Sequence, residues 1–180
     1  TDMMGSWSGA GQAGETVTIL EGLRDAIGEG VVRHARGIGI DQAEPDGPDA
    51  ALDLCRDADI VILALGESRS MSGEAASRSG LDLPGDQANF ARAVLALGKP
   101  VVVLLSSGRP ITAPWLFEQA DAVLATWFLG SEAGHAVADI LLGHVQPSGR
   151  LPLTWPRSVG QVPIFFGSRP SGRPASAEHY

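Results

Sequence analysis

The residues of this chain that could do chemistry gather in one loop, SMSGEAASRSGLDLPG, which runs from Ser70 to Gly85. Glu74 lies there among small residues, and Glu67 stands just before the loop. Paired carboxylates can divide the roles of general acid and general base, although either glutamate could equally be a solvated loop charge. The small neighbours of Glu74 leave room for a ligand, and a carboxyl in such a recess can donate a proton. We therefore predict that Glu74 is catalytic and that Glu67 anchors the loop.

Two further side chains of this loop could bind the same ligand. Ser72 lies two positions before Glu74, and its small side chain allows a ligand to approach. Arg78 follows Glu74 by four positions and can hold a hydroxyl group or balance nearby charge. We therefore expect Ser72 and Arg78 to contact the substrate.

Patterns for other chemistries are weak. No two histidines have the spacing of metal ligands, so we predict no metal site; the histidines are His34, His135, His144 and His179. The segment GAGQAG, residues 9–14, matches the glycine pattern of dinucleotide-binding loops, but that pattern requires a strand just before it. The preceding TDMMGSWS is not a strand pattern, so a flexible glycine loop is the better interpretation and nucleotide binding is the weakest alternative.

Composition sets the broad class of protein. The chain has 180 residues, of which 44% are hydrophobic and 19% charged, as expected for one globular domain. Its net charge of −8 argues against binding to nucleic acid or to acidic membranes. The single cysteine, Cys55, excludes an internal disulfide framework, and no apolar run approaches the roughly 20 residues of a membrane helix. The opening residues do not form a signal-peptide pattern, and the chain begins on Thr, so the compartment stays open.

The elements that must position the loop alternate between strand and helix, which favours a parallel sheet layered with helices. Three apolar runs, 59–66, 99–107 and 120–128, are predicted to be neighbouring central strands. Weaker strand patterns lie at 31–35 and at the edge-like 149–155, and a turn cluster lies at 44–48. Helices are predicted over 18–27, capped by Thr18 with Glu21, over 49–58 and 86–98, and over 131–143, capped by Ser131. Ligands of such sheets bind beyond the carboxyl ends of the strands, where Glu74 would lie.

Several long segments, in order along the whole chain, resemble the bacterial β-glucosidase branch of glycoside hydrolase family three. They are DMMGSWSGAG, LGESRSMSGEAASRSGLDLPGDQ, GKPVVVLLSSGRP and ATWFLGSEAGHAVADILLGHVQPSGRLPLTWPRSVGQVPI. Where many relatives read Glu-Gly-x-Asp-Arg, this chain reads Glu-Ala-Ala-Ser-Arg, so that Ser77 replaces an acidic residue while Arg78 keeps its place.

The resemblance implies an architecture. It predicts an α/β fold, an (α/β)6 sandwich with a mostly parallel sheet flanked by helices, in which the family's first strand is missing. Residues 1–157 would form this domain, and residues 158–180 would be an exit segment or linker toward an absent C-terminal domain. The family's N-terminal β/α barrel, which carries the nucleophilic aspartate, is absent and would be the partner of this domain.

The resemblance also implies a reaction, the retaining hydrolysis of terminal β-D-glucosyl residues without metal or organic cofactor. Glu74 would protonate the leaving oxygen and then activate water, while the barrel aspartate attacks the anomeric carbon. The isolated chain would then be inactive. A periplasmic or secreted location follows by analogy, and self-association into a homo-oligomer is a further expectation because an uncovered sheet edge favours it. The alternative is a non-catalytic carbohydrate-binding or structural α/β module.

Overall fold

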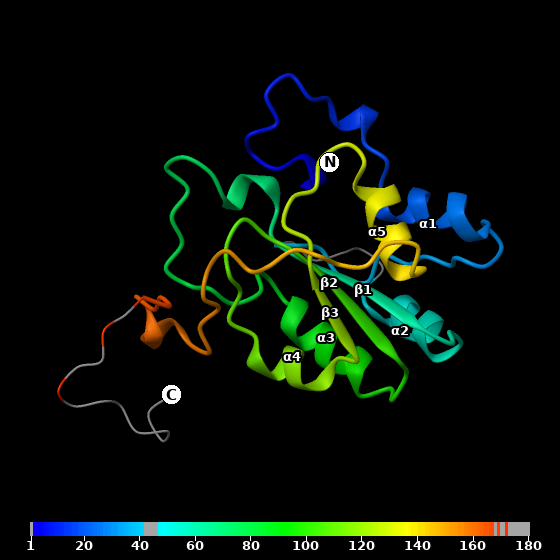
Figure 1. The fold of residues 1–180 in the computed structure, drawn as a ribbon. Coiled ribbons are helices and arrows are strands. Elements are labelled where there is room, and N and C mark those ends of the chain that lie inside the picture. The colour runs from blue at the N-terminus through cyan, green and yellow to red at the C-terminus, as the bar shows by residue number, and fades with distance from the viewer. Residues whose placement is uncertain (1, 42–46, 168, 170–171, 173–180) are drawn as a thin grey trace.

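A three-stranded parallel sheet forms the centre of the molecule in the computed structural model, which describes residues 2–41, 47–167, 169 and 172 (Figure 1). The strands are β1 (Val61–Gly66), β2 (Val101–Ser106) and β3 (Ala122–Ala125), in the order β1-β2-β3. Val61 pairs with Val101, and Gly66 with Ser106, so that β1 and β2 end at the same level. This confirms the predicted α/β fold with a parallel sheet, of which the described residues supply three strands.

β2 is the only one of these strands with a neighbour on each side. Val101, Val103, Leu104 and Leu105 are almost completely buried and Val102 is partly buried, as expected for a strand covered on both faces. In β1 burial alternates, and Ile62 is 38% exposed. The prediction of three central strands is therefore wrong for β1 and β3, which are the edges of the described sheet, because a strand becomes central only when another strand pairs with its outer edge.

The helices lie on both sides of the sheet (Figure 1). The main core joins alternate residues of β1 and β2 to apolar side chains of α2 (Asp49–Arg56), α3 (Gln87–Leu95) and α4 (Pro114–Gln119). The helices α1 (Ile19–Ile27) and α5 (Ala133–Leu141) pack against each other on the other side. None of the helices among the described residues is long and apolar enough to cross a membrane.

The contact between α1 and α5 is unusually close. A Cβ atom added to Gly22 of α1 would lie 2.2 Å from the carbonyl carbon of Gly134 in α5.

Thr18 caps α1 as predicted: its hydroxyl accepts from the backbone N–H of Glu21 at 3.2 Å, and the Glu21 carboxylate accepts from the Thr18 N–H at 2.8 Å. The predicted cap at Ser131 is wrong, because Glu132 precedes α5 and the Ser131 carbonyl accepts from the N–H of Val17.

Two predicted strands do not form. Residues 31–35 contain no strand, because β-branched residues make one only when a neighbour pairs with them, and Val31 is exposed. Residues 149–155 also form none, since Pro152 cannot donate to a ladder and Leu151 and Leu153 are exposed. The helix α4 was not predicted, because its six residues are too few for a clear periodic pattern. The predicted turn at 44–48 lies largely outside the described residues.

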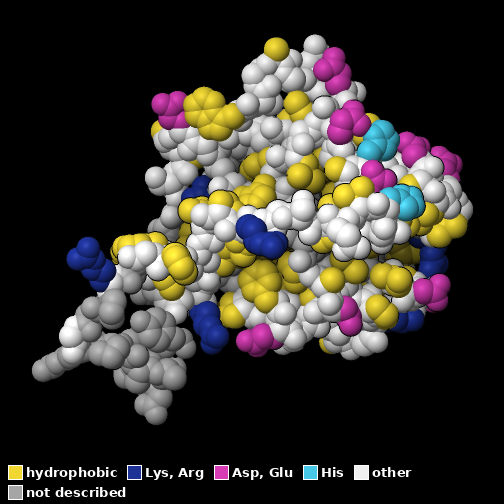
Figure 2. All heavy atoms as spheres, in the orientation of Figure 1, with side chains coloured by type: hydrophobic (Ala, Val, Ile, Leu, Met, Phe, Trp, Pro, Cys, Tyr) yellow, Lys and Arg dark blue, Asp and Glu magenta, His cyan; other side chains and the backbone are white. Residues whose placement is uncertain are grey.

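The segment that follows α5 is extended and carries a row of exposed apolar side chains. In Figure 2 such side chains gather across the face where this segment runs. The described part of this segment contains one short 3-10 turn, Val159–Gln161, and the domain boundary predicted at residue 157 stays a prediction. The large apolar side chains of this segment that are more than half exposed are those of Val145, Leu151, Leu153, Val159, Val162, Phe165 and Phe166.

Candidate active-site loop

The Glu74 loop, residues 70–85, lies beyond the carboxyl end of β1, at the edge of the sheet where ligands of parallel folds bind. The start of α3 fixes this strand end, because the Gln87 amide binds both backbone groups of Gly66 at 2.8 Å. A Cβ atom at Gly66 would lie 1.7 Å from the carbonyl oxygen of Ser106, so glycine is required for this close approach of β1 and β2. A single 3-10 turn, Arg69–Met71, spans the start of the loop.

Glu67, the residue after β1, is buried and paired. Only 2% of it is exposed. Its carboxylate oxygens lie 3.2 and 3.3 Å from Nε of Arg109, which follows β2, and one of them lies 3.5 Å from Nη1 of Arg78. The Ser72 hydroxyl donates to the same carboxylate at 2.9 Å. These contacts agree with the predicted anchoring role of Glu67, since they tie the start and middle of the loop to the sheet.

Ser72 and Arg78, the two residues expected to contact the substrate, both lie against Glu67. Ser72 is nearly buried, and it also lines the hollow described below. Arg78 points toward Glu67 and the sulfur of Met71, which lies 2.9 Å from its Nη1, and a quarter of its side chain is exposed. Whether they contact a substrate stays a prediction; within the protein, both hold the loop.

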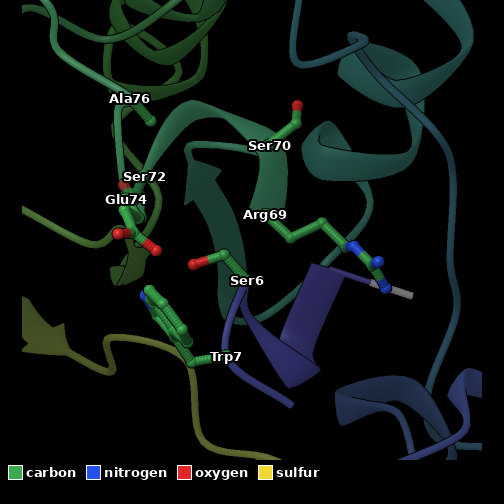
Figure 3. Close-up of a pocket in the computed structure, with 8 residues that line it drawn as sticks. Ser6, Trp7, Arg69, Ser70, Ser72, Glu74 and Ala76 are labelled. Atoms are coloured by element: carbon green, nitrogen blue, oxygen red, sulfur yellow. The ribbon is translucent and has the colours of Figure 1, made fainter. Parts of the chain in front are cut away.

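Glu74 differs from Glu67 in being exposed. It lines a hollow of about 400 Å³ whose other lining residues come from the loop and from the N-terminal segment. Figure 3 shows the Glu74 carboxylate directed into the same space as the Ser6 hydroxyl and the Trp7 indole. Trp7 is 74% exposed, which is unusual for so large an apolar side chain. The lining residues are Ser6, Trp7, Arg69, Ser70, Ser72, Gly73, Glu74 and Ala76.

The backbone around Glu74 adopts conformations that favour glycine. Gly73 has a φ of 129°, and a Cβ atom there would lie 2.7 Å from Oγ of Ser6. Ala75 has a φ of 58°, in the left-handed region that residues with a side chain rarely occupy. Glu74 is therefore presented by a tightly bent segment, and strained backbone of this kind often occurs at functional sites.

Two hydrogen bonds hold the N-terminal segment, one just before the Glu74 loop and one after β3. The N–H of Arg69 donates to the Asp2 carboxylate at 2.9 Å, and the N–H of Gly130, after β3, donates to the Met3 carbonyl at 2.8 Å. Residues 2–4 form a 3-10 turn and residues 5–8 contain no strand, so the GAGQAG segment lacks the strand that a dinucleotide-binding loop requires.

Sequence analysis did not find Ser6, Trp7 or Arg109. Trp7 lies 67 positions from Glu74, and nothing local distinguishes an exposed tryptophan from a core one. Among the described residues no cluster of histidine, cysteine or carboxylate side chains could hold a metal ion. The hollow thus offers one accessible carboxylate, several hydroxyls and an indole face, a set suited to proton transfer on an uncharged ligand rich in hydroxyl groups.

Comparison with known proteins shows the family of this chain. The model of the glycosyl hydrolase family 3 C-terminal domain matches residues 1–180. The chain is 39% identical to the periplasmic beta-glucosidase of Salmonella typhimurium over 198 residues, covering 98% of this chain and 26% of that protein. It is also 39% identical over 155 residues to a beta-xylosidase of Formosa agariphila, covering 86% of this chain and 21% of that protein.

Solved structures give the same relationship. The beta-glucosidase of Listeria innocua in complex with glucose superposes with a TM-score of 0.89 at 34% identity, covering 99% of this chain and 24% of that one. A beta-glucosidase of Erythrobacter marinus superposes with a TM-score of 0.80 at 34% identity, covering 88% of this chain and 25% of that one. The chain thus spans about a quarter of the length of these relatives. Its residues match throughout, and it belongs to the family of glycosyl hydrolase family 3 C-terminal domains.

Proposed function

We propose that this chain is the acid/base half of a retaining β-glucosidase, with Glu74 as the general acid and general base. The observation that carries the proposal is the contrast between the two glutamates. Glu67 is buried and engaged by Arg109, whereas Glu74 is exposed in a hollow at the carboxyl end of the sheet. Of the two carboxylates, Glu74 is therefore the one that a substrate can reach.

The second carboxylate of the reaction would come from an N-terminal barrel domain of the same protein. Retaining hydrolysis requires a nucleophile about 5 Å from the acid/base group. The barrel aspartate would attack the anomeric carbon while Glu74 protonates the departing oxygen, and Glu74 would then take a proton from the water that releases the sugar. The relatives are about four times as long as this chain, which leaves room for such a domain.

The other residues of the hollow suit a sugar ring. Ser6, Ser70 and Ser72 offer hydroxyl groups that can donate and accept, and the exposed Trp7 offers a flat apolar face beside Glu74 (Figure 3). The guanidinium N–H groups of Arg78 that do not face Glu67 would add further hydrogen-bond donors for the sugar. We propose a β-glucoside as the substrate; the Salmonella and Listeria relatives are named beta-glucosidases, and the Formosa relative is named a beta-xylosidase. The Salmonella protein is named periplasmic, and a periplasmic or secreted location is proposed here by analogy.

The isolated 180-residue chain should not turn over a β-glucoside, because one carboxylate cannot perform both steps of a double displacement. The measurement is release of nitrophenol from an aryl β-glucoside by the purified chain. Saturable hydrolysis that Glu74→Ala abolishes would show instead that the chain contains a complete active site.

The exposed apolar row from Leu151 to Phe166 fits a chain that packs against further domains.

The decisive test of Glu74 is chemical rescue in the full-length protein. With Glu74→Ala and a dinitrophenyl β-glucoside, the first step needs little proton donation, so the glycosyl-enzyme should accumulate because water lacks its base. Azide needs no base, and it should restore turnover and give a β-glucosyl azide, which is detected by mass spectrometry and NMR.

Glu67→Gln is the matched control, since it changes the other glutamate to a group of nearly the same shape. Azide should not accelerate this variant, because its Glu74 is intact. If azide leaves the Glu74→Ala variant unchanged, or rescues the Glu67→Gln variant, the assignment of Glu74 is wrong.

A further inference from the structure

The carboxylate of Glu74 owes its direction to the backbone that carries it. Within the described ranges, no hydrogen bond or ion pair holds this carboxylate. Its position therefore depends on the short segment from Met71 to Ala76, whose bends at Gly73 and Ala75 have positive φ angles. Any group that fixes the two ends of this segment also fixes the place of the carboxylate.

Arg109 binds both ends. Its Nη2 donates to the carbonyl oxygen of Met71, three residues before Glu74, and to that of Ala76, two residues after it, at 3.1 Å. The same Nη2 lies 3.5 Å from the Ser72 hydroxyl. One nitrogen of a residue that follows β2 thus closes the segment around Glu74.

The guanidinium is itself held in place. Its Nε lies 3.2 and 3.3 Å from the two oxygens of Glu67, the residue after β1. The side chain of Arg109 is 18% exposed and that of Glu67 is 1% exposed, so their charges attract each other with little screening by water. Because β1 and β2 are paired in register up to Gly66 and Ser106, this ion pair joins the residues that follow two hydrogen-bonded strand ends.

The loop after β2 also touches the segment directly. A Cβ atom at Gly108 would lie 2.3 Å from Cβ and Oγ of Ser72. The backbone before Arg109 therefore passes against the residue two positions before Glu74, and only glycine fits there. This contact and the hydrogen bonds of Arg109 come from one loop and act on one segment.

We propose that Arg109 is a positioning residue for the reaction, which holds the Glu74 segment so that the carboxylate faces the hollow. The inference rests on the proposed role of Glu74. Arg109 acts through the backbone on either side of Glu74 and through Glu67. Lysine could not replace it, because a single ammonium group lacks the planar fork of donors that reaches a carboxylate and two carbonyl oxygens together.

The test compares two substrates in the full-length protein, an alkyl β-glucoside, which needs acid catalysis, and a dinitrophenyl β-glucoside, whose first step does not. In Arg109→Lys, kcat/KM for the alkyl glucoside should fall about 100-fold, the cost of misplacing a catalytic group by about 1 Å. For the dinitrophenyl glucoside it should stay within about 3-fold of the parent value. A merely structural role would lower both values by the same factor, because it would only reduce the amount of folded enzyme.

A second variant guards against misfolding. The double variant Glu67→Gln, Arg109→Gln removes both charges of the buried pair together, and the partly exposed Arg78 loses its ion pair with Glu67. The donors to the Met71 and Ala76 carbonyl oxygens are then rearranged, and kcat/KM for the alkyl glucoside should again fall more than that for the dinitrophenyl glucoside. Arg92→Met is the matched control, since Arg92 lies over the Trp115 ring, away from the loop, and should leave the ratio of the two kcat/KM values unchanged.

The outcomes separate this inference from the proposed function. Glu74→Ala should lower kcat/KM more for the alkyl glucoside than for the dinitrophenyl glucoside, and azide should rescue it. If it does so while both Arg109 variants lower kcat/KM equally for the two substrates or not at all, the positioning role is wrong and the role of Glu74 stands. If Glu74→Ala itself shows neither effect, the proposed function fails. Selective loss in both Arg109 variants, with Arg92→Met unchanged, supports the inference.

Discussion

Substituting Gly22 by alanine tests whether the fold depends on the close packing of α1 and α5. The added Cβ atom would lie 2.2 Å from the carbonyl carbon and 2.3 Å from the carbonyl oxygen of Gly134. Carbon atoms in contact lie about 3.5 Å apart, so the two helices would have to separate by about 1 Å. The obstacle is backbone on the facing helix, which no side-chain rotation can relieve.

The expected loss of stability follows from two opposing effects. Overpacking costs about 1 to 3 kcal/mol. Alanine in place of glycine inside a helix returns up to about 1 kcal/mol. We therefore expect Gly22→Ala to lower the free energy of unfolding of this domain by about 1 to 2 kcal/mol.

The assay is urea denaturation of the full-length protein followed by circular dichroism, with thermal melts beside it. Gly30→Ala is the control, because a Cβ atom at Gly30 meets nothing within 4 Å and the change should be neutral or slightly stabilising. If Gly22→Ala is as stable as the parent while Gly30→Ala behaves as expected, α1 and α5 do not pack as closely as described.

Two further predictions concern local structure. Ala75→Gly should raise the free energy of unfolding by up to about 1 kcal/mol, because it removes the cost of an alanine in the left-handed region. Part of that gain is lost because glycine makes the unfolded chain more flexible. A lower free energy of unfolding in urea denaturation would contradict this. Hydrogen bonds from the backbone and then the side chain of Thr18 lower the pKa of Glu21, so the stability they give is present above the ordinary glutamate pKa and is lost as the pH falls through the lowered pKa. Thr18→Ala should therefore be less stable than the parent at neutral pH by an amount that shrinks in acid, and a constant difference across an acid titration would refute it.

Local patterns in the sequence predicted many of the elements that position the loop. The apolar runs that became β1 and β2 are long enough to be recognised without a partner, and the Thr18–Glu21 capping box depends only on residues three positions apart. The contrast between a strand-end Glu67 and a loop Glu74 among small residues was also visible, because it depends on neighbours along the chain.

Elements that depend on partners could not be predicted in this way. The β-branched residues at 31–35 have the composition of a strand, yet they form none, because strand formation requires a neighbouring strand. Ser131 has the residue type of a helix cap, but its backbone is used by Val17 and the helix begins later. In both places a contact with a distant part of the chain decided the outcome.

The sequence by itself determined the three apolar runs that contain β1, β2 and β3 and the loop that carries the candidate carboxylate, because both follow from runs of apolar residues and from the residue types beside Glu74. Only the tertiary structure decided what surrounds that carboxylate. The parallel pairing of β1 and β2 places Arg109 against Glu67, 42 positions earlier, and the docking of the N-terminal segment places Trp7 beside Glu74. Such contacts join residues that share no local pattern, and they exist only once the strands and helices have packed.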